Sequence, residues 1–101
     1  MRRDEIIAKL RDHEAELRAA GVASLALVGS IARGEHDANS DIDVAVRFGC
    51  DPPRSFAYFG RMDELRIRLQ SLFGKPVDII VEPIRKDALR FEVDRDRIIA
   101  F

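Results

Sequence analysis

The sequence predicts a mixed α/β fold, a small mixed sheet flanked by helices, on the basis of three hydrophobic patterns. Apolar residues recur at helical spacing in two segments, 4–20 and about 56–73. They alternate with polar residues, as in a half-buried strand, at 41–48 and 77–82. A short continuous apolar run at 24–28 is typical of a strand buried on both faces. The predicted order is therefore helix, strand, strand, helix, strand and C-terminal tail.

The predicted helices have apolar faces and recognisable ends. Residues 4–20 place Leu10 and Leu17 near one face of a helix. Gly21 and Gly74 follow the two helical patterns directly, and glycine is the residue that most readily ends a helix. The tail from Lys86 to Phe101 is expected to begin with a short helix, and its last apolar residues to complete the core or contact a partner.

Composition limits the classes of protein to which the chain can belong. Its 101 residues are expected to form a single domain spanning 1–101. There are 17 Lys and Arg against 18 Asp and Glu, so direct nucleic-acid binding through bulk positive charge is not expected. The single cysteine, Cys50, excludes an internal disulfide and a cysteine-based metal site. No apolar run approaches the ~20 residues of a membrane span, and a cytoplasmic protein without membrane contact is expected.

The strand predicted at 41–48 has one apolar face and one acidic face. Ile42 and Val44 point one way and Asp41 and Asp43 the other, because side chains alternate along a strand. At a rise of about 3.3 Å per residue the two carboxylates are attached roughly 6–7 Å apart and repel each other. A hard divalent cation with oxygen ligands, Mg²⁺, is the simplest partner that would stabilise them.

Asp78 is the third candidate carboxylate. Its neighbours Val77 and Ile79 point to the opposite face of the strand predicted at 77–82. If that strand lies beside 41–48, Asp78 reaches the same face as the first two carboxylates. Three carboxylates could then hold two metal ions about 3.5–4 Å apart, as in many phosphoryl-transfer sites.

The segment 29–34 (GSIARG) has the composition of a phosphate-binding turn. Gly29 allows the backbone to approach a phosphate closely. N–H groups at the start of a short helix, together with the Ser30 hydroxyl, would bind an anion without net positive charge. Arg33 either neutralises phosphate or locks the loop by pairing with a carboxylate.

Each of these features also has an ordinary structural explanation. Asp41 and Asp43 fit a solvated strand face, and Asp78 fits an exposed strand position. Gly29 and Ser30 fit a plain tight turn. Their occurrence together favours the functional interpretation, because each ordinary explanation would have to hold independently.

The combined pattern resembles a known signature. A Gly-Ser pair at 29–30, ten intervening residues and Asp-Ile-Asp at 41–43 are similar to the motif of the DNA polymerase β-like nucleotidyltransferase superfamily. The fuller strings 29–34 (GSIARG) and 40–43 (SDID) resemble its minimal nucleotidyltransferase branch, and the similarity extends over nearly the whole chain.

The resemblance implies a nucleotidyltransferase core of the polymerase β type that uses ATP and Mg²⁺, with two ions bound during catalysis. It assigns two sets of residues: Gly29, Ser30 and Arg33 as nucleotide-binding, and Asp41, Asp43 and Asp78 as catalytic and metal-binding. In this assignment Asp78 completes the site and helps to activate the attacking hydroxyl.

The resemblance also implies a partner. Many minimal nucleotidyltransferases are antitoxins of helical HEPN-type RNase toxins, and some transfer AMP from ATP to a tyrosine of the toxin. A core of 101 residues is expected to borrow its acceptor site from another chain, whether in a homo-oligomer or a hetero-complex. Two alternatives remain open: a non-catalytic antitoxin that acts by binding, and a transferase for a small aminoglycoside-like acceptor.

Overall fold

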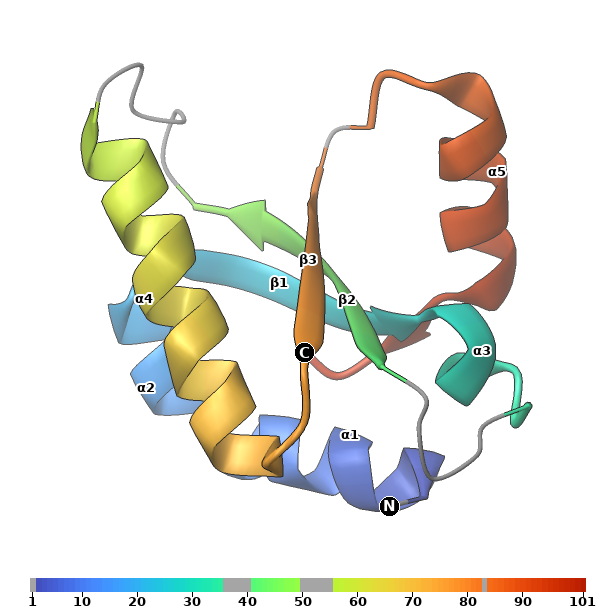
Figure 1. The fold of residues 1–101 in the computed structure, drawn as a ribbon, viewed down its shortest axis with the longest axis horizontal. Helices are drawn as coiled ribbons and strands as arrows, with labels where there is room; N and C mark the ends of the chain where they lie inside the picture. The colour runs from blue at the N-terminus through green and yellow to red at the C-terminus, as the bar shows by residue number, and fades with distance from the viewer. Residues whose placement is uncertain (1, 36–40, 50–55, 83) are drawn as a thin grey trace.

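The computed structural model describes residues 2–35, 41–49, 56–82 and 84–101. Within these ranges the strands form one mixed sheet in the order β3-β2-β1-β4, as the sequence predicts for the fold class (Figure 1). β1 runs antiparallel to both β2 and β4, whereas β2 and β3 are parallel. The strands are β1 (Val22–Val28), β2 (Ile42–Phe48), β3 (Val77–Val81) and β4 (Ile98–Ile99).

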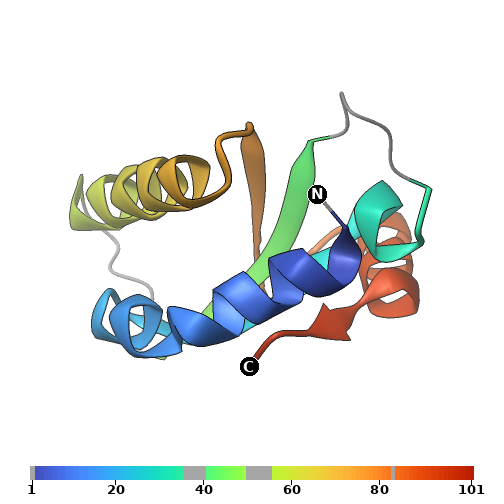
Figure 2. The ribbon, with the colours of Figure 1, turned by 90° about the horizontal axis from the view of Figure 1, so that it is seen from below.

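Helices cover both faces of this sheet. Figures 1 and 2 show α4 and α5 on opposite sides, with α1 and α2 on the side of α4. The helices are α1 (Arg3–Asp12), α2 (Glu14–Ala19), α3 (Gly29–Ala32), α4 (Phe56–Phe73) and α5 (Asp87–Asp96). In the described residues, no helix is both long enough and apolar enough to cross a membrane. The short helical turn expected after Gly29 and the helix expected at 56–73 are both present.

The prediction of one continuous helix over 4–20 was wrong, because the helix is interrupted at His13. The backbone there has φ −103° and ψ 14°, away from helical values. The His13 ring nitrogen Nδ1 lies 2.9 Å from the Lys9 carbonyl oxygen, which also accepts the His13 backbone N–H. A side chain that competes for a helical carbonyl weakens the regular hydrogen-bond pattern, and the chain bends into α1 and α2.

The C-terminal tail contains a strand that the sequence did not predict. Ile98 and Ile99 pair with Leu27 and Ala26 at the outer edge of β1. Leu25 extends the connection, because its N–H donates to the Phe101 carbonyl and its carbonyl accepts the Ala100 N–H. Two residues are too few to display alternation, so this strand depends on tertiary pairing rather than on local pattern.

Two apolar clusters hold the layers together. The larger cluster joins α1, α2 and α4 to one face of the sheet and includes fully buried Leu10, Leu69 and Val44. The smaller one joins α5 to the opposite face through Val93 and Ala45. The smaller cluster also includes Val28, the last residue of β1, so apolar packing on this face extends to the strand end that precedes Gly29.

Candidate active site

Sheet register brings three of the predicted site residues together. Asp43 on β2 is the direct partner of Val28, the last residue of β1, and of Asp78 on β3. Gly29 follows Val28 and opens α3, so the glycine turn begins where the two acidic strand positions meet. The placement of Asp78 beside 41–48 is what the sequence hypothesis required.

Gly29 lies directly against Asp43. Its φ of +79° is a conformation that residues with a side chain rarely adopt. A Cβ on residue 29 would overlap the Asp43 Oδ2 atom and lie 3.2 Å from the Asp43 Cβ and Cγ atoms. Ser30 is the next residue of the same turn, and its carbonyl accepts the Glu35 N–H at 2.9 Å. Only glycine permits this contact between the turn and the Asp43 side chain.

The Asp43 carboxylate lies in an unfavourable electrostatic environment. Partial burial raises its pKa to about 6, with further contributions from the Asp78 charge, a hydrogen bond with Asp78 and the Asp41 charge. Arg33 opposes the increase in the Asp43 pKa but does not cancel it. Carboxylates placed together in this way favour either a shared proton or a bound cation.

Two of the three predicted carboxylates lie side by side, and the third lies outside the strand. Asp43 and Asp78 share a register position, whereas Asp41 is exposed and precedes β2. Asp41 acts on Asp43 through its charge. In the parts of the chain that the structure describes, no three His, Cys, Asp or Glu side chains form a ready set of metal ligands. The roles of these carboxylates as metal ligands therefore remain predictions.

Arg33 is paired with carboxylates. Its Nη1 donates to Asp96 Oδ2 at 2.6 Å, and its Nε donates to Glu35 Oε2 at 3.0 Å. This pairing is what the loop-locking alternative for Arg33 requires, and its contact with phosphate remains a prediction. Asp96 is a site residue that the sequence interpretation missed. The available signal was helical spacing, because Asp96 lies seven and three residues after Leu89 and Val93 on one face of α5.

A hollow of about 120 Å³ opens at this place, between the sheet and α5. It is lined by Gly29, Arg33 and Asp43 together with Leu89, Glu92, Val93 and Asp96 of α5, and by Val28 and Ile80. Figure 1 shows α3 beside α5 at this end of the sheet. The C-terminal helix therefore forms one wall of the candidate site.

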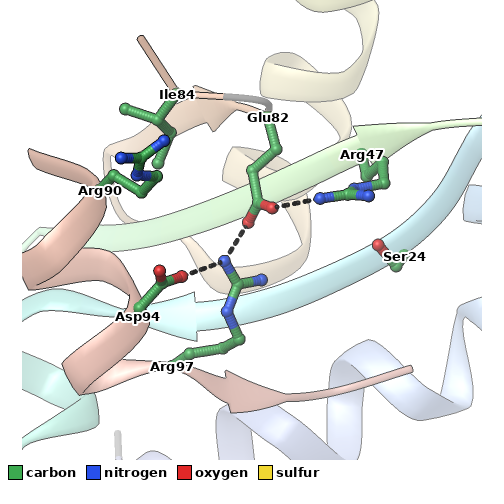
Figure 3. Close-up of a pocket in the computed structure, with 7 residues that line it drawn as sticks. All are labelled: Ser24, Arg47, Glu82, Ile84, Arg90, Asp94 and Arg97. Carbon is green, nitrogen blue, oxygen red and sulfur yellow. Dashed lines mark hydrogen bonds and ion pairs between the residues drawn. The ribbon is translucent and has the colours of Figure 1, made fainter. Parts of the chain in front are cut away.

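A larger hollow of about 460 Å³ lies farther along the same sheet face (Figure 3). Glu82, whose side chain is 8% exposed, lies between Arg47 and Arg97 and pairs with both. Arg97 also pairs with Asp94, and Arg90 pairs with Asp87 on α5. Because each arginine has a carboxylate partner, this network attaches α5 to the sheet and offers no excess charge to a ligand.

Glu82→Gln is therefore expected to destabilise the protein by about 2 kcal/mol, because it leaves the half-buried Arg97 guanidinium incompletely paired. Urea unfolding measures this loss. Nucleotide binding by the folded variant should stay within about twofold of that of the natural protein. A large loss of nucleotide affinity without loss of stability would instead assign this hollow to the substrate.

The fold and this site together define a nucleotidyltransferase: a glycine-serine turn at the end of one strand faces an Asp-x-Asp strand, which has a further Asp on its parallel neighbour. The chain belongs to the nucleotidyltransferase domain family, whose model matches residues 6–100. The resemblance inferred from the segments 29–34 and 40–43 is thereby confirmed at the level of the family.

Two proteins of Methanocaldococcus jannaschii are similar in sequence. "Putative protein adenylyltransferase MJ1215" is 38% identical over 79 residues, which cover 77% of this chain and 86% of that protein. "Putative protein adenylyltransferase MJ1379" is 35% identical over 78 residues, which cover 76% of this chain and 75% of that protein.

Two solved structures are similar in fold. A structure described as a "putative minimal nucleotidyltransferase" has a TM-score of 0.76 and 28% identity, and the match covers 97% of this chain and 95% of the other. A structure described as a toxin-antitoxin with AMP-PNP has a TM-score of 0.66 and 26% identity. It covers all of this chain and 73% of the other. The predicted core of minimal nucleotidyltransferase type is thus confirmed.

Proposed function

We propose that this chain transfers AMP from ATP to a hydroxyl group of a partner protein in a Mg²⁺-dependent reaction, and that it thereby acts as an antitoxin. The partner in this proposal is a helical HEPN-type toxin, and the acceptor is a tyrosine of that toxin. The names of the two M. jannaschii relatives support protein adenylylation. The similar toxin-antitoxin structure with AMP-PNP supports both the nucleotide and the biological setting.

One observation carries the proposal: Gly29 contacts Asp43, and Asp43 pairs directly with Asp78 on the neighbouring strand. It places backbone that can approach phosphate within contact distance of a carboxylate pair. Nucleotidyl transfer needs these two elements together, because a triphosphate must be held while negative charge develops on the attacking and leaving oxygens.

The proposed reaction is one displacement at the α-phosphorus of ATP. The acceptor oxygen forms a bond to this phosphorus, the bond to the β-phosphate bridging oxygen breaks, and pyrophosphate leaves. In this proposal Asp78, which is exposed beside Asp43, accepts the hydroxyl proton. The glycine turn holds the phosphates through its N–H groups and the Ser30 hydroxyl.

Magnesium fits the side chains at this position. Asp43 and Asp78 are adjacent oxygen donors, and their mutual repulsion is relieved by a cation. Asp41 is close enough to act on Asp43 by its charge, and it is the third candidate ligand. When bound, Mg²⁺ would neutralise the charge of the transferring phosphate group.

The size of the site supports an acceptor that arrives from another chain. The hollow at Asp43 is about 120 Å³, well below the roughly 300–1,000 Å³ of sites that enclose a drug-sized ligand. The nucleotide would therefore occupy an open surface, and a partner protein would cover it while presenting its hydroxyl.

The test is a transfer assay with a candidate helical HEPN-type toxin as acceptor. We expect label from ATP marked at the α-phosphate to appear on that protein, and EDTA to abolish the transfer. Label from the γ-phosphate should not transfer, and a Tyr→Phe acceptor should remain unlabelled. Transfer of the γ-label would indicate a kinase instead. No transfer by the natural protein in the presence of a bound partner would leave only a binding antitoxin.

A further inference from the structure

Asp96, near the C-terminal end of α5, is a buried carboxylate outside the predicted motif. Its side chain is 4% exposed, and both of its oxygens are used. Oδ2 accepts from Arg33 Nη1 at 2.6 Å, and Oδ1 accepts from Arg95 Nε at 3.1 Å. Arg95 and Arg33 hold the pKa of Asp96 below its usual range. Asp96 is therefore charged at neutral pH and firmly held.

The Arg33 contact joins elements that are distant in sequence but adjacent in space. Asp96 and Arg33 are separated by 63 positions, and Figures 1 and 2 both show α3 and α5 side by side. Arg33 directly follows α3, and its backbone N–H donates to the Gly29 carbonyl at 3.2 Å. The side chain that Asp96 holds therefore belongs to the residue that closes the glycine turn.

The Arg33 guanidinium already has two carboxylate partners. Its guanidinium meets Asp96 on one side and Glu35 on the other, and both contacts raise its pKa. An arginine paired with two carboxylates is an effective cross-link, because its planar group fixes the geometry of both partners.

We propose that Asp96 is a positioning residue for nucleotidyl transfer: through Arg33 it holds the Gly29–Ala32 turn against Asp43. The α5 helix thus determines where the phosphates sit relative to the carboxylates. This inference rests on the proposed function for its kinetic readout. Residues that act through another group typically change activity about 10–100-fold when they are altered.

The central test compares Asp96→Asn, Arg33→Gln and the double variant with the natural protein. Asp96→Asn keeps the shape of the side chain but removes its charge. It should lower kcat/KM about 10–100-fold and raise the KM for ATP about tenfold, with the acceptor KM within about twofold. A smaller folded fraction would lower kcat alone, so a change in the KM for ATP distinguishes positioning from a purely structural role.

The double variant tests whether Asp96 acts through Arg33. If it does, the double variant is no worse than Arg33→Gln alone, because both changes remove the same link. Arg95→Gln is the matched control, since Arg95 pairs with the other oxygen of Asp96 and is no part of the link through Arg33, and it should stay within about twofold of the natural protein. Multiplicative losses in the double variant, or an equal loss in Arg95→Gln, would overturn the proposal.

Amide hydrogen exchange provides a readout that needs no activity. The N–H groups of Arg33, Gly34 and Glu35 donate to carbonyls of the Gly29–Ala32 turn. Asp96→Asn should accelerate their exchange at least about tenfold, while exchange in the centre of β2 is unchanged. Unchanged exchange of the turn would refute the positioning role. Absence of transfer by the natural protein would instead refute the proposed function, so the two failures can be distinguished.

Discussion

Replacing Asp43 with Asn is expected to lower nucleotidyl transfer at least about a thousandfold while making the metal-free protein more stable at neutral pH. The variant loses the charge at the centre of the site, which is expected to stabilise the transition state by several kcal/mol. Because about 1.4 kcal/mol corresponds to a factor of ten in rate, removing this charge gives the thousandfold decrease. The variant also removes a carboxylate whose ionisation burial and Asp78 disfavour.

The pH dependence of this stabilisation has a definite sign. Because the Asp43 pKa is about 6 in the folded protein and 3.8 in an ordinary Asp, ionisation weakens the folded state progressively as the pH rises through this range. The full difference would be about 3 kcal/mol, and solvent screening reduces the expected effect to about 1–2 kcal/mol. The stability advantage of Asp43→Asn over the natural protein should therefore increase from about pH 4 to about pH 7 and change little at higher pH.

Urea unfolding in EDTA from pH 4 to pH 8 measures this gain, and the α-phosphate transfer assay measures the activity. Asp12→Asn, which changes an exposed carboxylate at the end of α1, is the control and should leave activity unchanged and stability within about 0.5 kcal/mol. A variant that transfers AMP at the natural rate, or one that is no more stable than wild type at pH 7, would contradict the assignment of Asp43.

Gly29→Ala is expected to be the most damaging single-methyl change in the described chain, with a loss of about 2–5 kcal/mol of stability and of nearly all transfer activity. The positive φ costs roughly 1–2 kcal/mol for a residue with a side chain, and the added Cβ displaces Asp43 at a further cost of roughly 1–3 kcal/mol. The atoms that must move belong to the carboxylate that the reaction needs.

Gly34→Ala is a matched control, because Gly34 has the same φ of +79° but nothing within 4 Å of its added Cβ. We expect it to lose only about 1–2 kcal/mol, the conformational cost, and to retain transfer. Urea unfolding and initial rates of transfer give both quantities for the two variants. If Gly29→Ala and Gly34→Ala lost the same stability and the same activity, the contact of residue 29 with Asp43 would have no special importance.

Local pattern predicted most of the elements because it depends on side chains that are neighbours along one helix or strand. The alternation around Asp43 and Asp78 predicted β2 and β3 with the correct acidic face. Local pattern failed at His13, where a ring nitrogen lies at hydrogen-bonding distance from a helical carbonyl, and at β4, where two residues pair with a distant strand. Neither event has a periodic signal.

The sequence by itself determined the fold class, the family and the candidate chemistry, because spacing along the chain decides which carboxylates share a strand face and where a turn can approach phosphate. Only the tertiary structure decided that Asp43 lies opposite Asp78 and against Gly29, and that Arg33 is held by Asp96. Strand register and helix docking are set by the packing of the whole apolar core, and contacts between residues 63 positions apart leave no local trace in the sequence.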